Sequence, residues 1–244
     1  MASEVKTNKI SPATGTDVTL GDASDTFTIP ASATLDVNGT IDITGATATG
    51  FPSSGFISVQ TFTASGTYTV PAGVTKQLVY VTGSGGGGGQ ASGAVDACGG
   101  GGGGTVIKFL ELAAASTVTV AIGAAGTEGL AGNVTTFTTA SGTSFTALTG
   151  PAGQAGPQNA NNAAATLPTG GDMNIGGGSG TAGPKAGSGG SSYWGGGGCG
   201  SWLSISTANA AVAFGSGGGA GSNSDGYRNG TNGAAGVVFV LEFK

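Results

Sequence analysis

The chain has 244 residues with 53 glycines, and charged residues make up only 8% of it, against about a quarter in an average globular protein. Its net charge of −5 lies mostly in residues 1–50, which hold six acids and two lysines; without a basic stripe, nucleic-acid binding is not expected. No run of about 18 apolar residues is present, and residues 1–9 lack an apolar signal core, so neither membrane insertion nor ordinary secretion is indicated.

Residues 10–50 are predicted to form short β-strands, because apolar residues alternate with polar ones along them. The alternating apolar pairs are Phe27 and Ile29, Leu35 and Val37, and Ile41 and Ile43. Asn38-Gly39 indicates a turn. A two-residue hairpin there would put the last two pairs on opposite faces, whereas a three-residue loop or a winding rung keeps them on one face. One copy of this thin segment has almost no core, so we expect it to wind or to pack against copies from other chains.

Five aspartates are spread over the same region, namely Asp17, Asp22, Asp25, Asp36 and Asp42. Their simplest interpretation is that they keep strand edges solvated, where charge discourages aggregation. A cation held on a fibre axis is the alternative, and the sequence leaves it open.

Residues 51–59 are predicted to be a linker, and residues 60–244 a distal domain. Apolar alternation and turn residues predict strands at 60–70 (around a turn at 64–66), 77–81, 105–112, 116–122, 134–139 and 236–243. The run from Val237 to Leu241 indicates a strand buried on both faces. Helical periodicity is weak at 208–214 and unconvincing elsewhere, so the predicted fold class is all-β.

Glycine recurs at every third position in several stretches. These are Gly123 to Gly132, Gly150 to Gly156, Gly177 to Gly183, Gly215 to Gly221 and Gly230 to Gly236, beside solid runs at 85–89, 99–104 and 195–198. A three-residue period is that of the extended polyproline-II helix, in which a bare glycine edge lets two backbones approach closely. The stretches are short and only eight prolines are present, which excludes collagen. We therefore expect a bundle of short polyglycine-II helices carried by a small β structure; flexible glycine loops are the alternative.

Cys98 and Cys199 each adjoin a glycine run. A disulfide between them would close a loop of about 100 residues and add roughly 4–5 kcal/mol of stability. Two unpaired small residues are the simpler interpretation, and the sequence leaves the question open.

Enzymatic activity is not expected. The chain has no histidine, the commonest general base and metal ligand, and its carboxylates after residue 100 are far apart in sequence. Gly83 to Gly88 fits the dinucleotide pattern G-x-G-x-x-G, but glycine and loop residues follow it in place of a helix. We expect no catalytic residue, no cofactor and no metal site.

From Gln60 onward the sequence resembles the glycine-rich domain found in many phage tail fibre proteins and adhesins. The resemblance lies in Phe62 to Val74, Leu78 to Val81 leading into the Gly85 run, Thr117 to Gly126, Gly170 to Gly178, Gly190 to Gly195 and Gly233 to Val240. Residues 5–50, with Lys6 to Pro12 and Asp25 to Pro30, look like the leader of short tail fibre proteins in marine phages.

The resemblance implies a homotrimeric fibre made in the host cytoplasm and carried on the virion tail. Residues 1–50 would form a thin trimeric β stalk that attaches to other virion tail proteins, and residues 60–244 a bundle of polyglycine-II helices. Host-receptor recognition and attachment through loops at the bundle tip are implied, although the receptor, protein or glycan, is not. A purely structural virion component, such as a capsid decoration fibre or a tail spacer, is the alternative.

Aromatic and cationic side chains are the receptor-contact candidates, because such residues dominate recognition hot spots. They are Tyr193, Trp194, Trp202, Tyr227 and Arg228. Trp194 and Trp202 are more simply explained as covers of glycine-helix faces or fillers of a subunit seam. For Tyr227-Arg228 the two explanations are balanced, because the polar residues around them indicate an exposed loop.

Overall fold

The computed structural model describes Asn38 and residues 55–91, 97–142, 144–158, 164, 167–183, 186–201, 208–222 and 229–244. Residues 1–51 and 52–244 form separate compact units. The predicted strands and aspartates of residues 10–50 lie outside the described residues, except that Asn38 is an exposed bend. No helix occurs among the described residues, and their strands are all antiparallel, which confirms the all-β prediction.

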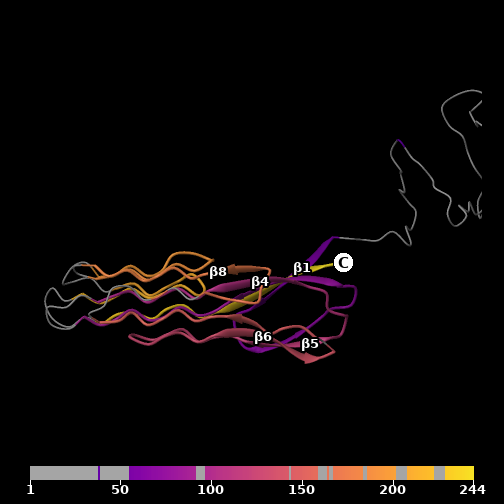
Figure 1. Ribbon diagram of the computed structural model, residues 1–244, viewed down its shortest axis with the longest axis horizontal. Helices are drawn as coiled ribbons and strands as arrows, with labels where there is room; N and C mark the ends of the chain where they lie inside the picture. The colour runs from indigo at the N-terminus through magenta and orange to yellow at the C-terminus, as the bar shows by residue number, and fades with distance from the viewer. Residues whose placement is uncertain are drawn as a thin grey trace, which may run out of the picture. The chain divides into compact units, whose positions relative to one another are not determined.

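The described strands form two sheets (Figure 1). The five-stranded sheet has the order β1 (Phe56–Phe62), β9 (Val237–Phe243), β3 (Lys76–Thr82), β4 (Thr105–Leu110) and β8 (Met173–Ile175). The four-stranded sheet has the order β2 (Gly66–Thr69), β5 (Thr117–Ala121), β6 (Thr135–Ser141) and β7 (Leu148–Gly150).

One hydrophobic core joins the two sheets. Alternate residues of most of the strands point into it, as the two-residue period of a β-strand requires. Its buried members are Tyr68, Val70, Val74, Val79, Val81, Val106, Leu110, Leu112, Val118, Val120, Phe137, Leu148, Val238 and Val240. Since β1 and β2 lie in different sheets, the turn at 64–66 carries the chain from one layer of the sandwich to the other.

A carboxylate is buried in this core. Glu242 is fully buried; it accepts hydrogen bonds from the Tyr68 hydroxyl at 2.9 Å and from the Ser58 hydroxyl. Burial, with Glu242 as the second cause, raises the pKa of Tyr68 far above its usual range, so the phenol stays a donor. Two hydroxyl donors thus replace part of the hydration that the carboxylate loses on folding.

The strand predictions are confirmed for six stretches; two short strands were missed, and one strand begins earlier than predicted. The short strands β7 and β8 were not predicted, because three residues are too few to establish an alternation. Residues 208–214 are not helical; the main chain there bonds to neighbouring segments instead. Strand β1 begins at Phe56, inside the stretch predicted as a linker. Strand β9 lies between β1 and β3, with one face in the core and Phe239 and Leu241 half-buried on the other, so the prediction of burial on both faces is correct for one face only.

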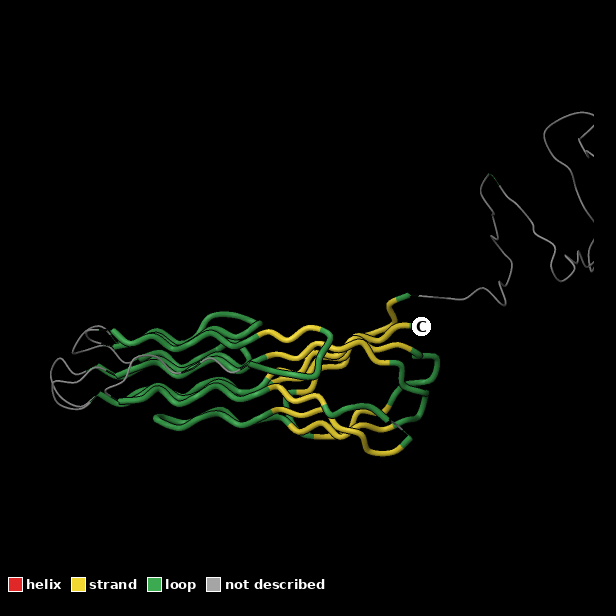
Figure 2. The backbone as a smooth tube through the Cα atoms, viewed as in Figure 1, coloured by secondary structure: helices red, strands yellow, loops and turns green. Residues whose placement is uncertain are grey.

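Strands continue directly into glycine-rich segments (Figure 2). The chain leaves β3 as residues 83–91, returns as 97–104 into β4, and enters β9 from residues 229–236. The segments run side by side away from the sheets, and we call their far end the distal end. Contacts at this end join Ala97 to Gln158, Gln90 to Asn229, and Ser201 to Ala220, whose neighbour Gly221 bonds Gly89.

Residues 83–91, which we call the central segment, donate main-chain hydrogen bonds with a period of three. The N–H groups of Gly83, Gly86 and Gly89 bond to the carbonyls of Gly104, Gly101 and Cys98. The next positions, Ser84 and Gly87, donate to Asn133 and Leu130, and Gly85 and Gly88 donate to Ala234 and Thr231. The residue numbers of the acceptors fall as those of the donors rise. These three neighbours therefore run antiparallel to the central segment.

The carbonyls of the central segment follow the same period toward three other neighbours. Ser84 and Gly87 accept from Gly153 and Gly156, Gly85 and Gly88 accept from Gly126 and Gly129, and Gly86 and Gly89 accept from Gly218 and Gly221. These three neighbours run parallel to it. The main chain of the central segment is therefore bonded to six surrounding stretches.

This packing explains why some runs are solid glycine and others have glycine only at every third position. Residues 83–89, 97–104 and 215–222 are buried at every position, whereas along 150–158 only Gly150, Gly153 and Gly156 are buried. A Cβ on Gly86 or Gly87 would lie 1.9 or 1.8 Å from a main-chain oxygen of a neighbour. Interior segments are therefore surrounded by neighbouring segments at every position, whereas an outer segment contacts its neighbours along one side only.

Tyr68→Phe tests the buried carboxylate. Losing the hydroxyl removes one of the two described donors to Glu242, so the free energy of unfolding is expected to fall by about 1–3 kcal/mol, measured by chemical denaturation. Tyr193→Phe is the control, since Tyr193 is exposed. Equal stabilities of the two variants would show that the Tyr68 hydroxyl contributes nothing.

Gly87→Ala and Gly196→Ala test the close approach of the segments. The Gly87 Cβ would clash with the Thr127 carbonyl, whereas nothing lies within 4 Å of a Cβ on Gly196. We expect Gly87→Ala to lower the free energy of unfolding by at least about 3 kcal/mol and Gly196→Ala to change it by less than about 0.5 kcal/mol. Chemical denaturation measures the free energy of unfolding of both variants. A Gly87→Ala variant as stable as the parent would contradict the close packing of the interior segments.

Candidate functional site

Two candidate aromatic residues lie against the five-stranded sheet, away from the distal end. The Trp194 ring packs on Phe239 with centroids 4.6 Å apart and on Tyr80 at 5.9 Å. Its indole N–H donates to the Thr82 hydroxyl at 2.8 Å. Trp194 therefore covers the face of the sheet where β3 and β9 meet the glycine-rich segments.

Tyr193 stands at the edge of the same cluster. Its ring meets Trp194 edge-on at 4.9 Å and Tyr80 at 5.9 Å, and 44% of the residue remains exposed. Aromatic contacts of this geometry stabilise the ring positions by about 0.5–1.5 kcal/mol each beyond area burial. Tyr193 thus offers a fixed, partly open ring beside the sheet.

The other three candidates lie outside the described residues. Trp202 directly follows Ser201, and Tyr227-Arg228 directly precede Asn229. Ser201 and Asn229 both belong to the distal end. The five sequence candidates therefore do not form one described cluster: Tyr193 and Trp194 lie at the sheet, and Trp202, Tyr227 and Arg228 adjoin distal residues in the chain.

A polar cavity of about 350 Å³ lies at the distal end. It is lined by Gly89, Gln90, Glu128, Gly129, Ala155, Gly156, Pro157 and Gln158. Glu128 accepts the Gly230 N–H at 3.1 Å, and the Gln90 amide donates to Asn229 at 2.9 Å. A carboxylate and two amides around one cavity suit ligands that present hydroxyl or amide groups.

Sequence reasoning missed this cavity. The available sequence signal was the presence of three long polar side chains in stretches otherwise made of small residues, namely Gln90, Glu128 and Gln158. Only the packing of three segments, at 83–91, 123–129 and 150–158, brings the residues together.

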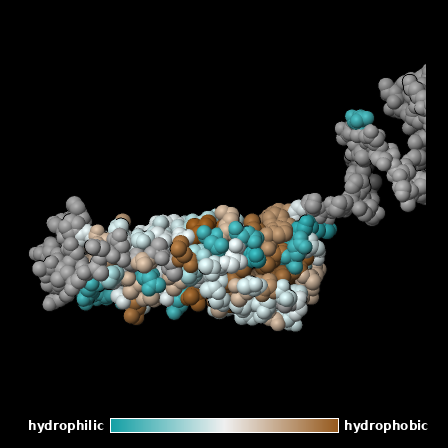
Figure 3. All heavy atoms as spheres, viewed as in Figure 1, coloured by the Kyte–Doolittle hydropathy of each residue, from teal (hydrophilic) through white to brown (hydrophobic). Residues whose placement is uncertain are grey.

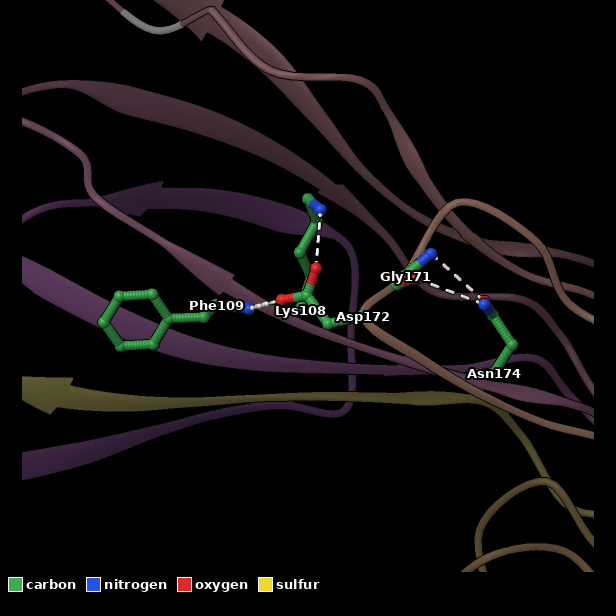
Figure 4. Close-up of polar contacts among 5 residues, drawn as sticks. All are labelled: Lys108, Phe109, Gly171, Asp172 and Asn174. Carbon is green, nitrogen blue, oxygen red and sulfur yellow. Dashed lines mark hydrogen bonds and ion pairs between the residues drawn. The ribbon is translucent and has the colours of Figure 1, made fainter.

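Asp172 fastens β8 to β4 at the sheet end (Figure 4). Its carboxylate accepts the Phe109 N–H at 2.8 Å and pairs with the Lys108 amine at 3.0 Å. The backbone hydrogen bond from Phe109, assisted by Lys108, lowers the pKa of Asp172. Asn174 closes the adjoining turn by bonding both the N–H and the carbonyl of Gly171.

Both cysteines are thiols in the structure, with Cys98 buried and Cys199 exposed. Within the described ranges no cluster of three or more His, Cys, Asp or Glu residues suits a metal ion. The same part of the chain contains no helix of the length and hydrophobicity that crossing a membrane requires.

A family model described as a glycine-rich domain matches residues 59–241. The chain belongs to this glycine-rich domain family. The match covers nearly all of both sheets and every described glycine-rich segment, so the sandwich and the bundle are parts of one family domain. No curated protein matches the chain.

Asp172→Asn tests the fastening of β8. A carboxylate with a lowered folded-state pKa contributes stability above its unfolded pKa, and the contribution is lost as pH falls below 3.8 through the folded pKa. We expect the variant to melt at a lower temperature than the parent at pH 7, with the difference shrinking as pH falls below 3.8. Thermal unfolding at a series of pH values measures this, with exposed Glu111→Gln as the control. A difference that does not change with pH would contradict the role of the charge.

Proposed function

We propose that this protein is a phage tail fibre protein that recognises a host receptor through the distal end of its glycine-rich bundle. Residues 1–50 attach it to the particle and trimerise it, and residues 60–244 are the distal domain. The resemblance of residues 5–50 to tail fibre leaders and the glycine-rich domain family both support this proposal.

The glycine-rich segments are, in this proposal, polyglycine-II helices. A left-handed helix with three residues per turn points successive N–H groups in three directions. The donors of the central segment turn to three different neighbours in succession and return to the first after three residues. A β-strand, with its two-residue period, would alternate between two neighbours.

Such a bundle suits recognition because it holds the ends of many segments at fixed positions. Each interior segment is bonded along its length to neighbours of both directions, so the distal connections start from an ordered base. A preorganised surface loses less entropy on binding than a flexible one.

The observation that carries the proposal is the separation of the two ends of the domain. The chain enters at Gly55 beside the sheets, where the Lys244 N–H bonds the Gly55 carbonyl, and the bundle extends away from this end (Figures 1 and 2). Trp202, Tyr227 and Arg228 adjoin distal residues, as does the polar cavity. Attachment at one end and recognition at the other is the arrangement that a fibre tip needs, and three tips on one stalk raise avidity through effective concentration.

Cell labelling tests the function. The full-length chain carrying a fluorescent dye is expected to label bacterial hosts of the particle that bears it and to block adsorption of that particle. A variant with Trp202→Ala, Tyr227→Ala and Arg228→Ala should lose at least about tenfold in labelling, the scale of a hot-spot residue. Tyr193→Ala, at the sheet end, should retain it.

The outcome separates this function from that of a structural virion component. Failure to label any susceptible host, with particles still infectious after loss of the protein, would favour a decoration or spacer role. Equal labelling by the triple variant and the parent would place recognition elsewhere on the molecule.

A further inference from the structure

The outer face of the five-stranded sheet is apolar on the side away from the glycine-rich segments. Val59 of β1 pairs with Leu241 of β9, which pairs with Leu78 of β3, and Leu78 pairs with Phe109 of β4. Cross-strand partners lie on the same face of a sheet, so these four side chains form one row. Phe56 and Phe243 form the beginning of a second row beside it.

This face is only partly covered in one chain. Phe56 is 61% exposed, Val59 46% and Phe109 45%, whereas the neighbouring part of the face lies beneath Tyr193 and Trp194. Figure 3 shows hydrophobic atoms gathered at the sheet end, while the bundle is mostly pale. Contiguous apolar patches of this kind mark association sites on soluble proteins.

The end at which the chain enters restricts what covers the face. Residues 1–50 precede β1, and Gly55 bonds Lys244 at the end of the sheet. In copies joined through residues 1–50, residues 51–55 tie the sheet end of each domain within about 18 Å of the joined segments. The sheet ends are therefore the parts of the copies nearest one another, at a high effective concentration.

A second copy also fits the chemistry of the face better than the N-terminal segment does. Residues 1–50 hold six acids and two lysines, whereas residues 51–244 hold six acids and five bases. The described row carries no charged side chain, and Lys76 lies at its border, where it pairs with Phe243. An uncharged apolar row is matched by another apolar row more favourably than by an acidic segment.

We propose that this face is the contact between copies of the glycine-rich domain, with the β1 side of one copy packed against the β4 side of the next. A cyclic trimer is closed by such a head-to-tail contact, in which two different patches of each chain meet. This inference rests on one part of the proposed function, namely that copies of the chain associate through residues 1–50. The contact gathers the domains at their sheet ends and leaves the distal ends free.

A pair of cysteines tests the contact. Val59 and Phe109 of one chain are three strands apart, about 14 Å, which is too far for a disulfide within the chain. In a full-length Cys199→Ser background, Val59→Cys with Phe109→Cys is expected to form disulfides between chains and to give a covalent trimer on a non-reducing gel. Each single change should give no trimer.

Leu130 provides the matched control. It is apolar and 61% exposed but lies in a glycine-rich segment, so Val59→Cys with Leu130→Cys should give no trimer. Maleimide should also label Phe109→Cys about tenfold or more slowly than Leu130→Cys, because a covered thiol reacts only when the contact opens.

Light scattering of the full chain separates this inference from the proposed function. An oligomeric mass with rapid labelling at position 109 and no covalent trimer would overturn the contact alone. A monomeric mass would overturn both the contact and the proposed trimer; slow labelling in that monomer would assign the face to residues 1–50 of the same chain.

Discussion

The fold depends on main-chain hydrogen bonding between extended segments that leave room for only the smallest side chains. Each interior position of residues 83–89 donates or accepts toward a neighbouring main chain, and unpaired buried N–H and carbonyl groups would each cost about 1–3 kcal/mol. Glycine loses the most backbone entropy on folding, so a chain with 53 glycines needs dense bonding to be stable. The six-neighbour arrangement provides it, and it admits only glycine at most enclosed positions and small residues such as Ser84 and Ala220 at the others.

The sandwich supplies what the glycine-rich segments lack. Glycine has no side chain with which to specify the register of one segment against another, and weakly specified strands slip. Strands β3, β4 and β9 are fixed in register by a core of valines and aromatic rings, and each continues without a break into a segment. The register set in the sheets is thereby passed along the bundle, in which a shift of one residue would bring a side chain where only glycine fits.

Much of the fold was predictable from two clear periods in the sequence, the two-residue alternation of apolar residues and the three-residue repeat of glycine. Alternation of apolar residues gave six strand stretches, and glycine at every third position gave a three-residue repeat of close contacts. The sheet order, the separation of β1 from β2 and the neighbours of each segment were not predictable, because they depend on which of many similar glycine stretches meet. The distal cavity escaped for the same reason: Gln90, Glu128 and Gln158 converge only after packing.

The distribution of side chains follows from the same constraint. Inside the bundle the buried side chains are small, such as those of Ser84, Cys98 and Ala220, so larger functional groups are confined to the outer positions, the sheet end and the distal end. At the sheet end the outer face of the five-stranded sheet exposes apolar residues such as Val59 and Phe109; at the distal end the cavity is lined by Glu128 and amides. An apolar end favours contact between like surfaces, whereas a polar end with directional donors and acceptors favours selective recognition. The two ends of the domain are thus chemically suited to different partners, and the glycine bundle between them keeps those partners apart.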